Sequence, residues 1–166
     1  MKSEIMAMVL TASDSRKMGD DLSGSTLVGL LLGMGATVHE RLIVADDLEV
    51  LRNTLVSHAD RDDINVIITT GGTGFSPRDN TPEATRAVID REAPGLAEAI
   101  RRETAEKTPM AMLSRGIAGI RGNTLIVNLP GSPKAVKECF EVIKPVLQHA
   151  VDLLNEHTEH GPEKEN

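Results

Sequence analysis

A buried strand that leads directly into a glycine-rich loop constrains the fold of this chain more than any other feature. Residues 66–70 are apolar or β-branched, which is typical of a buried strand. Three glycines follow within residues 71–74, and glycine lets backbone N–H groups turn toward a ligand. Residues 81–83 then indicate a helix start, with Thr81 as the N-cap and Pro82 at the first helical position. A strand, a glycine loop and a helix N-terminus in this order predict an anion-binding site.

Two charged residues complete the loop, and they set different requirements. Arg78 offers a forked guanidinium group that can bind two oxygens of a phosphate. Asp79 beside it would repel a phosphate unless a metal ion lies between them, and Mg²⁺ is the usual ion in such sites. The alternative is a tight turn between a strand and a helix, in which Arg78 and Asp79 form a solvated pair. The carboxylate and the helix start together favour the functional interpretation.

The same order of elements occurs again near the C-terminal end. Residues 124–129 indicate another buried strand, Pro130-Gly131 a turn, and Ser132-Pro133 another helix start. Because strands and helices alternate, we expect an α/β fold, a Rossmann-like three-layer α/β/α sandwich with a mostly parallel central sheet. The expected strands are residues 5–11, 37–44, 66–70 and 124–129, with an extended segment over 113–120 and a hairpin turn at 121–123. One expected helix follows residues 19–25, and a second begins at 46–47. Two more run over 82–90 and 95–104. The last extends from 134 to about 154, with Pro145 as a kink or a restart.

Polar residues follow several of the predicted strands. Ser13 and Asp14 follow the first strand, Asp46 follows the second, and the two glycine segments follow the third and the last. In parallel sheets, ligands bind outside the carboxyl ends of the strands, so all of these residues would lie at one edge. Taken singly, Ser13-Asp14 and Asp46 are ordinary connections between a strand and a helix. It is their convergence that predicts a site.

Composition limits the classes of function. The 166 residues carry a net charge of −7, which disfavours general nucleic-acid binding. Cys139 is the only cysteine, so no internal disulfide can form, as expected in the reducing cytoplasm. No apolar run is long enough to span a membrane, and the five histidines show no zinc-type spacing. With Phe75 and Phe140 as the only aromatic residues, a purine would have to be held by aliphatic side chains and the backbone. We expect one domain over residues 1–155 and a polar tail over residues 156–166.

Two long motifs resemble those of a known family. Residues 69–85, Thr-Thr-Gly-Gly-Thr-Gly-Phe-Ser-Pro-Arg-Asp-Asn-Thr-Pro-Glu-Ala-Thr, and residues 129–134, Leu-Pro-Gly-Ser-Pro-Lys, are similar to the two signatures of molybdenum-cofactor biosynthesis proteins of the MogA/MoaB type. The resemblance extends from residue 5 to residue 154. It implies a cytoplasmic molybdopterin adenylyltransferase, which transfers AMP from Mg-ATP to the terminal phosphate of molybdopterin and releases pyrophosphate. It also implies a homotrimer that passes its product to the molybdenum insertase. Ser13-Asp14, Asp21-x-Ser23-Gly24 and Leu113-Ser114-Arg115 also fit this family.

The resemblance also implies roles for individual residues. Asp79 is carried over as catalytic and Asp46 as its acidic partner, and the chemistry of the reaction assigns both as Mg²⁺ ligands or organisers rather than bases. The second acidic position often reads Pro-Asp in the family, whereas this chain has Ala45-Asp46-Asp47, so the choice between Asp46 and Asp47 stays open. A phosphate monoester is largely ionised near neutral pH, since its second pKa is about 6, and the reaction therefore needs positioning and charge neutralisation rather than a general base. The residues expected to bind the phosphates and the pterin are Ser13, Asp14, Asp21, Ser23, Gly24, Thr70, Gly71, Gly72, Thr73, Gly74, Arg78, Ser114, Arg115, Pro130, Gly131, Ser132, Pro133 and Lys134.

Three alternative functions are also compatible with the sequence. A nucleotide pyrophosphatase on the same fold, as in proteins of the competence-damage-inducible type, would hydrolyse a nucleotide without a pterin. A catalytically silent trimer would bind molybdopterin tightly without releasing pyrophosphate. The insertase itself contains a related domain within a longer multidomain chain, and we expect this chain to be too short for it.

Overall fold

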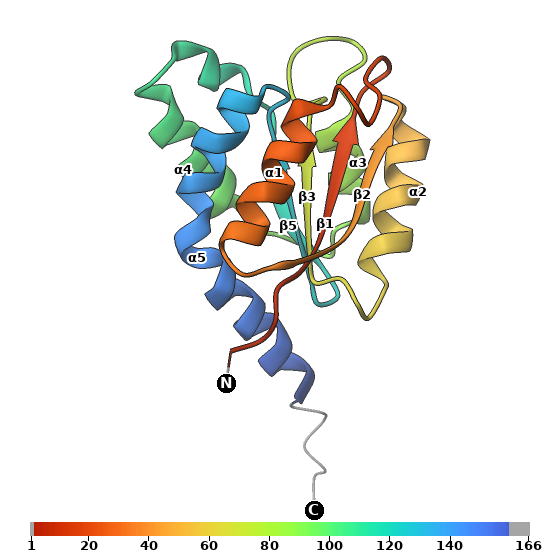
Figure 1. The fold of residues 1–166 in the computed structure, drawn as a ribbon, viewed down its shortest axis with the longest axis vertical. Helices are drawn as coiled ribbons and strands as arrows, with labels where there is room; N and C mark the ends of the chain where they lie inside the picture. Colours follow the sequence, from red (N-terminus) through yellow and green to blue (C-terminus); the bar gives the residue numbers. More distant parts are fainter. Residues whose placement is uncertain (1, 160–166) are drawn as a thin grey trace, which may run out of the picture.

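Strands and helices alternate along the chain in the computed structural model, which describes residues 2–159 (Figure 1). In chain order the elements are β1 (Met6–Ala12), α1 (Leu22–Gly33), β2 (Thr37–Val44), α2 (Leu48–Ala59), β3 (Val66–Thr70), α3 (Thr81–Val88), β4 (Arg91–Glu92), α4 (Pro94–Ala105), the 3-10 helix η1 (Pro109–Leu113), β5 (Ala118–Arg121), β6 (Thr124–Leu129) and α5 (Pro133–Glu159). The six strands of the described residues form one sheet in the order β2-β1-β3-β6-β5-β4.

The register of the parallel strands brings their carboxyl ends to one edge. β1 pairs in parallel with β2 and β3, and β3 pairs in parallel with β6. Thr70 is paired with Thr11 on one side and with Leu129 on the other, so the ends of β1, β3 and β6 lie level. This arrangement confirms the mostly parallel sheet that the sequence predicts.

The strands at the β4 edge of the sheet pair in an antiparallel manner. β5 and β6 form a hairpin, and Gly122 in its turn has a φ of +55°, a conformation that glycine adopts without strain. This hairpin agrees with the predicted turn at residues 121–123. The two-residue strand β4, which pairs with β5, is not predicted by the sequence.

Helices cover both faces of the sheet, and each interface has its own apolar core. α1, α4 and α5 pack on one face, against residues such as Val9 and Ile68. α2 and α3 pack on the other face, against residues such as Leu10 and Ile67. Neighbouring residues of a strand point to opposite faces, so both sides of the central strands are apolar. The three-layer sandwich is therefore confirmed.

Polar side chains cap three of the helices. The side chains of Asp21, Asp47 and Ser132 accept a hydrogen bond from the N–H group three residues further on, at 3.1, 3.0 and 3.1 Å, at the starts of α1, α2 and α5. The prediction of Thr81 as the cap of α3 is wrong. Asn80 holds the N-cap position without a side-chain cap bond, and Thr81 is the first helical residue, with its side chain buried.

Three further segments differ from the expectation. η1 is not predicted, and β5 begins only at Ala118, so residues 114–117 of the expected extended segment over residues 113–120 are an irregular connection. α5 continues through Pro145 and ends at Glu159, so the first residues of the expected tail are helical. Residues 160–166 of that tail lie outside the described residues. Within the described part of the chain, no helix has both the length and the apolar character needed to cross a membrane.

Asn128 is a buried polar residue that joins several elements. Its Nδ2 donates to the hydroxyl groups of Thr69 and Thr85 at 3.0 and 2.9 Å. Its Oδ1 accepts the backbone N–H group of Ile117 at 3.2 Å. One side chain of β6 therefore connects β3, α3 and the segment that leads into β5.

Replacing Asn128 with leucine should lower the free energy of unfolding by about 2–4 kcal/mol, because buried polar groups then lose their partner. Urea unfolding followed by circular dichroism measures this change. Asn123→Ala, at the exposed hairpin turn, is the matched control and should stay within about 0.5 kcal/mol of the parent protein. A loss below about 1 kcal/mol for Asn128→Leu would contradict a stabilising role of these hydrogen bonds.

Candidate functional site

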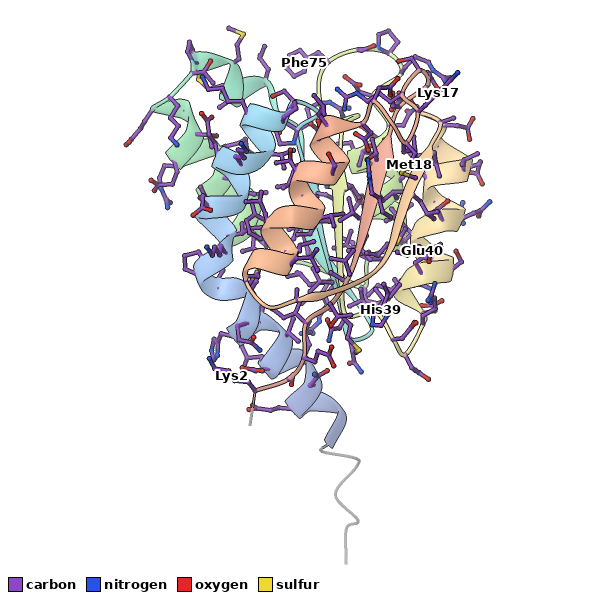
Figure 2. The ribbon with its side chains drawn as sticks, in the orientation of Figure 1. Lys2, Lys17, Met18, His39, Glu40 and Phe75 are labelled. Atoms are coloured by element: carbon purple, nitrogen blue, oxygen red, sulfur yellow. The ribbon has the colours of Figure 1, made fainter. Side chains whose placement is uncertain are left out.

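A cleft of about 450 Å³ lies at the carboxyl edge of the sheet. One wall is formed by the glycine loop of residues 71–74, by Asp79 and by the turn of residues 130–132. The opposite wall is formed by α4, η1 and the first turns of α5. Figure 2 shows Phe75, which follows the glycine loop, at the same end of the molecule as Lys17 and Met18 of the β1–α1 connection. The two glycine segments of the sequence thus border one cleft.

The glycine loop packs too closely for side chains at its first two positions. Gly71 has a φ of +90°, and a Cβ there would lie 2.5 Å from a carbonyl oxygen of β1. Gly72 has a φ of +69°, and a Cβ there would collide with the hydroxyl group of Thr81 and lie 3.2 Å from Oδ1 of Asp46. No hydrogen bond among the described residues uses the N–H groups of residues 72–74. These N–H groups are therefore available to an anion.

Three hydroxyl groups hold the loop and the turn in place. Thr81 of α3 donates to the carbonyl of Gly71 at 3.0 Å. Thr70 at the end of β3 donates to the carbonyl of Pro130 at 2.6 Å. Ser23 at the start of α1 donates to the next carbonyl of the same turn at 2.5 Å. The threonine expected to cap α3 thus fixes the preceding loop instead.

Asp14 and Asp46 are joined by reciprocal hydrogen bonds. The N–H group of Asp14 donates to Oδ2 of Asp46 at 3.1 Å, and the N–H group of Asp46 donates to Oδ1 of Asp14 at 3.0 Å. Arg78 donates from Nε and Nη2 to the two carboxylate oxygens of Asp14, at 2.9 and 2.8 Å. This hydrogen-bonded guanidinium group lowers the pKa of Asp14. The connections that follow β1, β2 and β3 are therefore linked through charged groups.

No described residue forms an ion pair with Asp46 as Arg78 does with Asp14. Its Oδ1 is buried and has no hydrogen-bond partner among the described residues. Burial raises the pKa of Asp46 above the usual 3.8, and the negative charges of Asp14 and Asp79 raise it further. Asp47 points elsewhere and caps α2. The structure thus places Asp46, rather than Asp47, against the glycine loop.

Asp79 lines the cleft at the end of the loop. Its Oδ2 accepts the N–H group of Ser76 at 3.0 Å and lies 2.9 Å from where a Cβ of residue 74 would be. No group of three His, Cys, Asp or Glu among the described residues could hold a metal ion by itself. A cation between Asp46 and Asp79 would therefore take its other ligands from water or phosphate, as Mg²⁺ commonly does.

Three residues expected at the ligand instead form the buried start of α1, with Asp21 as its N-cap and Ser23 and Gly24 in its first turn. Asp21 is buried, accepts a hydrogen bond from the hydroxyl group of Thr11 at 2.6 Å, and pairs with Arg41 at 3.3 Å. Ser23 is buried behind the turn that follows β6. Gly24 lies so close to the carboxylate of Asp21 that a Cβ would collide with it. These residues support the cleft from behind.

The remaining predicted residues are spread around the rim. Ser13 accepts the N–H groups of Ser15 and Arg16, at 3.3 and 3.1 Å, and shapes the β1–α1 connection. Pro133 begins α5. Lys134 is exposed and has no hydrogen bond or ion pair within the part of the chain that the structure describes.

Ser114 and Arg115 are neighbours in the sequence but take different positions. Ser114 lines the cleft. Arg115 packs on the outside of the loop, where Nε donates to the carbonyl of Gly74 and Nη2 donates to the carbonyl of Asp79, both at 2.8 Å. Of these two residues, Ser114 alone lies in the cleft lining. The expectation that both contact the ligand is therefore supported for Ser114 and not for Arg115.

Sequence analysis does not identify the opposite wall of the cleft. Ile100 and Thr104 lie four residues apart on α4, a spacing that marks a helix face but not what the face covers. Arg16 is also not identified, although its Nη1 donates to the carbonyl of Gly131 at 2.9 Å. The other unpredicted residues of this wall are Arg101, Thr108, Met110, Ala111, Leu113, Ala135, Glu138 and Cys139.

Comparisons with known proteins agree with the resemblance seen in the motifs. The family model described as a probable molybdopterin binding domain matches residues 8–149. The chain is 39% identical over 150 residues to a molybdopterin adenylyltransferase of Helicobacter pylori (strain J99), with 88% of this chain and 85% of that protein covered. It is 53% identical over 114 residues to the molybdenum cofactor synthesis protein cinnamon of Drosophila melanogaster, covering 69% of this chain and 19% of that longer protein. Among solved structures, the molybdopterin biosynthesis enzyme MoaB of Thermus thermophilus matches with a TM-score of 0.83 at 45% identity, covering 90% of this chain and 96% of the other.

Asp46→Asn should raise the melting temperature near neutral pH by roughly 1–3 °C, because the amide removes a charge that burial and two neighbouring carboxylates disfavour. The folded-state pKa of Asp46 is raised, so its ionisation costs stability as the pH rises through that pKa. The gain should therefore fade below the usual value of 3.8, where both states are protonated. Thermal melting across acidic and neutral pH measures this difference. Asp47→Asn, which retains a helix cap, is the control and should show no gain; an unchanged or lower melting temperature for Asp46→Asn near neutral pH would contradict the electrostatic interpretation.

Proposed function

Because the chain belongs to the family of probable molybdopterin binding domains, we propose that it is a molybdopterin adenylyltransferase. It transfers AMP from ATP to the terminal phosphate of molybdopterin and releases pyrophosphate. A relative that carries this name covers 88% of the chain at 39% identity. The observation that carries the proposal is a glycine loop whose N–H groups at residues 72–74 bond to no described residue, placed directly against the carboxylates of Asp46 and Asp79.

Backbone N–H groups bind the phosphates. The N–H groups of residues 72–74 supply donors without a competing acceptor in the described chain. The N-termini of α3 and α5 follow the two glycine segments, and their dipoles favour negative charge at the same edge. Ser132 caps α5 and lines the cleft, so its hydroxyl lies close to this binding site. Lys134, exposed at the first turn of α5, adds a cation that no described residue neutralises.

Asp46 and Asp79 fit a Mg²⁺ ion that enters with ATP. The buried Oδ1 of Asp46 lacks any hydrogen-bond partner in the described chain, and a second carboxylate lies near enough to raise its pKa. The two carboxylates would hold a hard divalent cation, which would supply positive charge to offset the repulsion between them and the phosphates. Asp14 holds the backbone of Asp46, and the N–H group of Ser76 holds the carboxylate of Asp79.

The reaction requires positioning more than proton transfer. An oxygen of the terminal phosphate of molybdopterin forms a bond to the α-phosphorus of ATP. The bond from that phosphorus to the oxygen bridging to the β-phosphate breaks, and pyrophosphate leaves with the electron pair. The attacking phosphate is already ionised, because its second pKa is about 6, so no side chain has to remove a proton. The loop and the carboxylates therefore act by bringing two anions together and by stabilising charge in transit.

The cleft offers an aliphatic site for a substrate ring. Ile100, Met110 and Leu113 line it, whereas neither phenylalanine does. A volume of about 450 Å³ is sufficient for a heterocycle of the size of a pterin or a purine. This agrees with the expectation that ring binding depends on aliphatic side chains and backbone groups.

Assembly and transfer of the product complete the proposal. The protein forms a homotrimer and passes its adenylylated product to a molybdenum insertase, as the family resemblance implies. A groove of about 770 Å³ between α4, β5 and α5 is lined mainly by apolar side chains, and Val146 and Leu153 on α5 are 46% and 53% exposed. Such an apolar surface is suited to a contact between subunits.

Asp79→Asn separates a metal-binding role from a structural role of this residue. Asparagine keeps an acceptor for the N–H group of Ser76 but lacks the charge that Mg²⁺ requires. The variant should fold and bind molybdopterin, and its turnover should fall by roughly 10²-fold or more, with only partial recovery at high Mg²⁺. The measurement is pyrophosphate release at saturating ATP, alongside thermal melting.

Asp47→Asn is the matched control for this experiment, because Asp47 is the neighbour of Asp46 in the sequence but caps α2. Its turnover should stay within about threefold of the parent. Turnover near that of the parent for Asp79→Asn would remove Asp79 from the catalytic machinery. Tight binding of molybdopterin by the parent protein without pyrophosphate release would instead identify a silent binding protein, and nucleotide hydrolysis without a pterin would identify a pyrophosphatase.

The proposed assembly has a separate test. Multi-angle light scattering at micromolar concentration should give the mass of three 17.8 kDa chains. Leu153→Glu, in the exposed apolar groove, should shift the protein toward smaller species, because an interface does not accommodate an unpaired charge. A monomer at micromolar concentration for the parent protein would contradict the trimer.

A further inference from the structure

Arg115 makes several hydrogen bonds beside the glycine loop, and the proposed chemistry does not use this residue. Its backbone N–H group donates to the carbonyl of Thr73 at 2.8 Å. Its Nε and Nη2 donate to the carbonyls of Gly74 and Asp79, both at 2.8 Å. One residue therefore holds both ends of the segment of residues 74–79, although the two ends are separated by an exposed stretch.

Glu83 fixes the guanidinium group of Arg115 from the opposite side. Its Oε1 contacts Nη1 of Arg115, and its Oε2 accepts from Nη2 at 3.4 Å. Glu83 lies in the first turn of α3, directly after the loop. A planar guanidinium group with donors on three nitrogens can serve two carbonyls and a carboxylate at once, which a lysine ammonium group cannot do in the same geometry.

Apart from Arg115, the segment is joined to another part of the fold by the two hydrogen bonds from Arg78 to Asp14. Phe75, Ser76, Pro77 and Arg78 are all exposed. Within the segment, Oδ2 of Asp79 accepts the N–H group of Ser76, so the position of the carboxylate depends on the shape of the loop. Arg115 itself is not among the described residues that line the cleft; it lies beside Arg86 and Glu92 in a separate hollow.

We infer that Arg115, held by Glu83, is a positioning residue that sets the carboxylate of Asp79 for the reaction. It acts through the backbone carbonyls of Gly74 and Asp79 and does not bind substrate. The inference deepens the proposed function and rests on it for its kinetic part. It replaces the expectation that Arg115 binds the phosphates or the pterin.

The chain contains a close match for a control variant. Arg121 donates from Nε and Nη2 to both oxygens of Asp60, at 2.8 and 3.1 Å, and from Nη1 to the carbonyl of Val88 at 2.9 Å. The side chains of Arg115 and Arg121 are 34% and 27% exposed. Arg121 thus makes the same kinds of contact at the opposite end of β5 from the cleft.

The experiment compares Arg115→Lys, Glu83→Gln and Arg121→Lys. Arg115→Lys should lower kcat for pyrophosphate release by roughly 10- to 100-fold and leave the Kd for molybdopterin within about threefold, because small misplacements reduce the reaction rate more than ground-state binding. Glu83→Gln should change kcat in the same direction by a smaller factor. Arg121→Lys should leave both constants within about threefold of the parent. An equal loss of kcat in Arg121→Lys would show a general structural effect and overturn the inference.

Hydrogen exchange of the loop gives a second readout that needs no activity. Peptides that cover residues 73–80 should exchange several-fold faster in Arg115→Lys than in the parent, and at the parent rate in Arg121→Lys. If the parent protein releases no pyrophosphate, the proposed function fails, and this measurement decides the inference on its own. Unchanged exchange of these peptides in Arg115→Lys would overturn it, as would a rise in the Kd for molybdopterin without a loss of kcat.

Discussion

Close packing around Gly71 is the constraint on which the cleft depends. A Cβ at Gly71 would lie 2.5 Å from the carbonyl oxygen of Ala12, and a Cβ at Gly131 would lie 3.4 Å from the Cα of Gly71. Only glycine permits the close approach at position 71, and the level ends of β1, β3 and β6 make it possible. The N–H group of Gly71 is taken by Leu129 at 3.1 Å, whereas the N–H groups that follow have no acceptor among the described residues. The anion binding that we propose for the loop therefore depends on how three strands end.

The charged groups around this loop lower the stability of the ligand-free protein, and the ligand that we propose would compensate for this. Arg78 stabilises Asp14 through two hydrogen bonds, but Asp46 keeps a buried oxygen without a partner in the described chain and a raised pKa. Because the pKa of Asp46 is raised, its ionised carboxylate lowers the free energy of unfolding, and the cation that we propose would offset this cost. Asp14 and Asp46 therefore have different roles although they share two hydrogen bonds: Asp14 organises, and Asp46 is the group that a metal ion would satisfy.

Local patterns in the sequence predicted the framework, and contacts distant in sequence decided the details. The apolar runs and the glycine segments predicted the parallel strands, because burial on both faces and tight turns leave a direct trace in composition. The role of Thr81 was not predictable, because a threonine at a helix start can either cap the helix or donate a hydrogen bond to the preceding loop. The burial of Asp21 was likewise hidden, because it depends on Thr11 and Arg41, which lie 10 and 20 residues away.

The distinction between Asp46 and Asp47, and the far wall of the cleft, also depend on contacts between residues distant in sequence. Asp46 and Asp47 are adjacent, and only the start of α2 shows which one caps a helix and which one faces the loop. The wall built by α4 and η1 joins the glycine loop through tertiary packing, so its residues carry no motif of their own.

The measurement that tests the central claim most directly is the transfer of label from ATP carrying radioactive phosphorus at the α-position, in the presence of Mg²⁺ and molybdopterin. We expect the label to appear on molybdopterin as AMP in a phosphoanhydride, with one pyrophosphate released for each AMP transferred; label that remains in ATP, or that appears only as free AMP, would contradict the assignment of this cleft to adenylyl transfer.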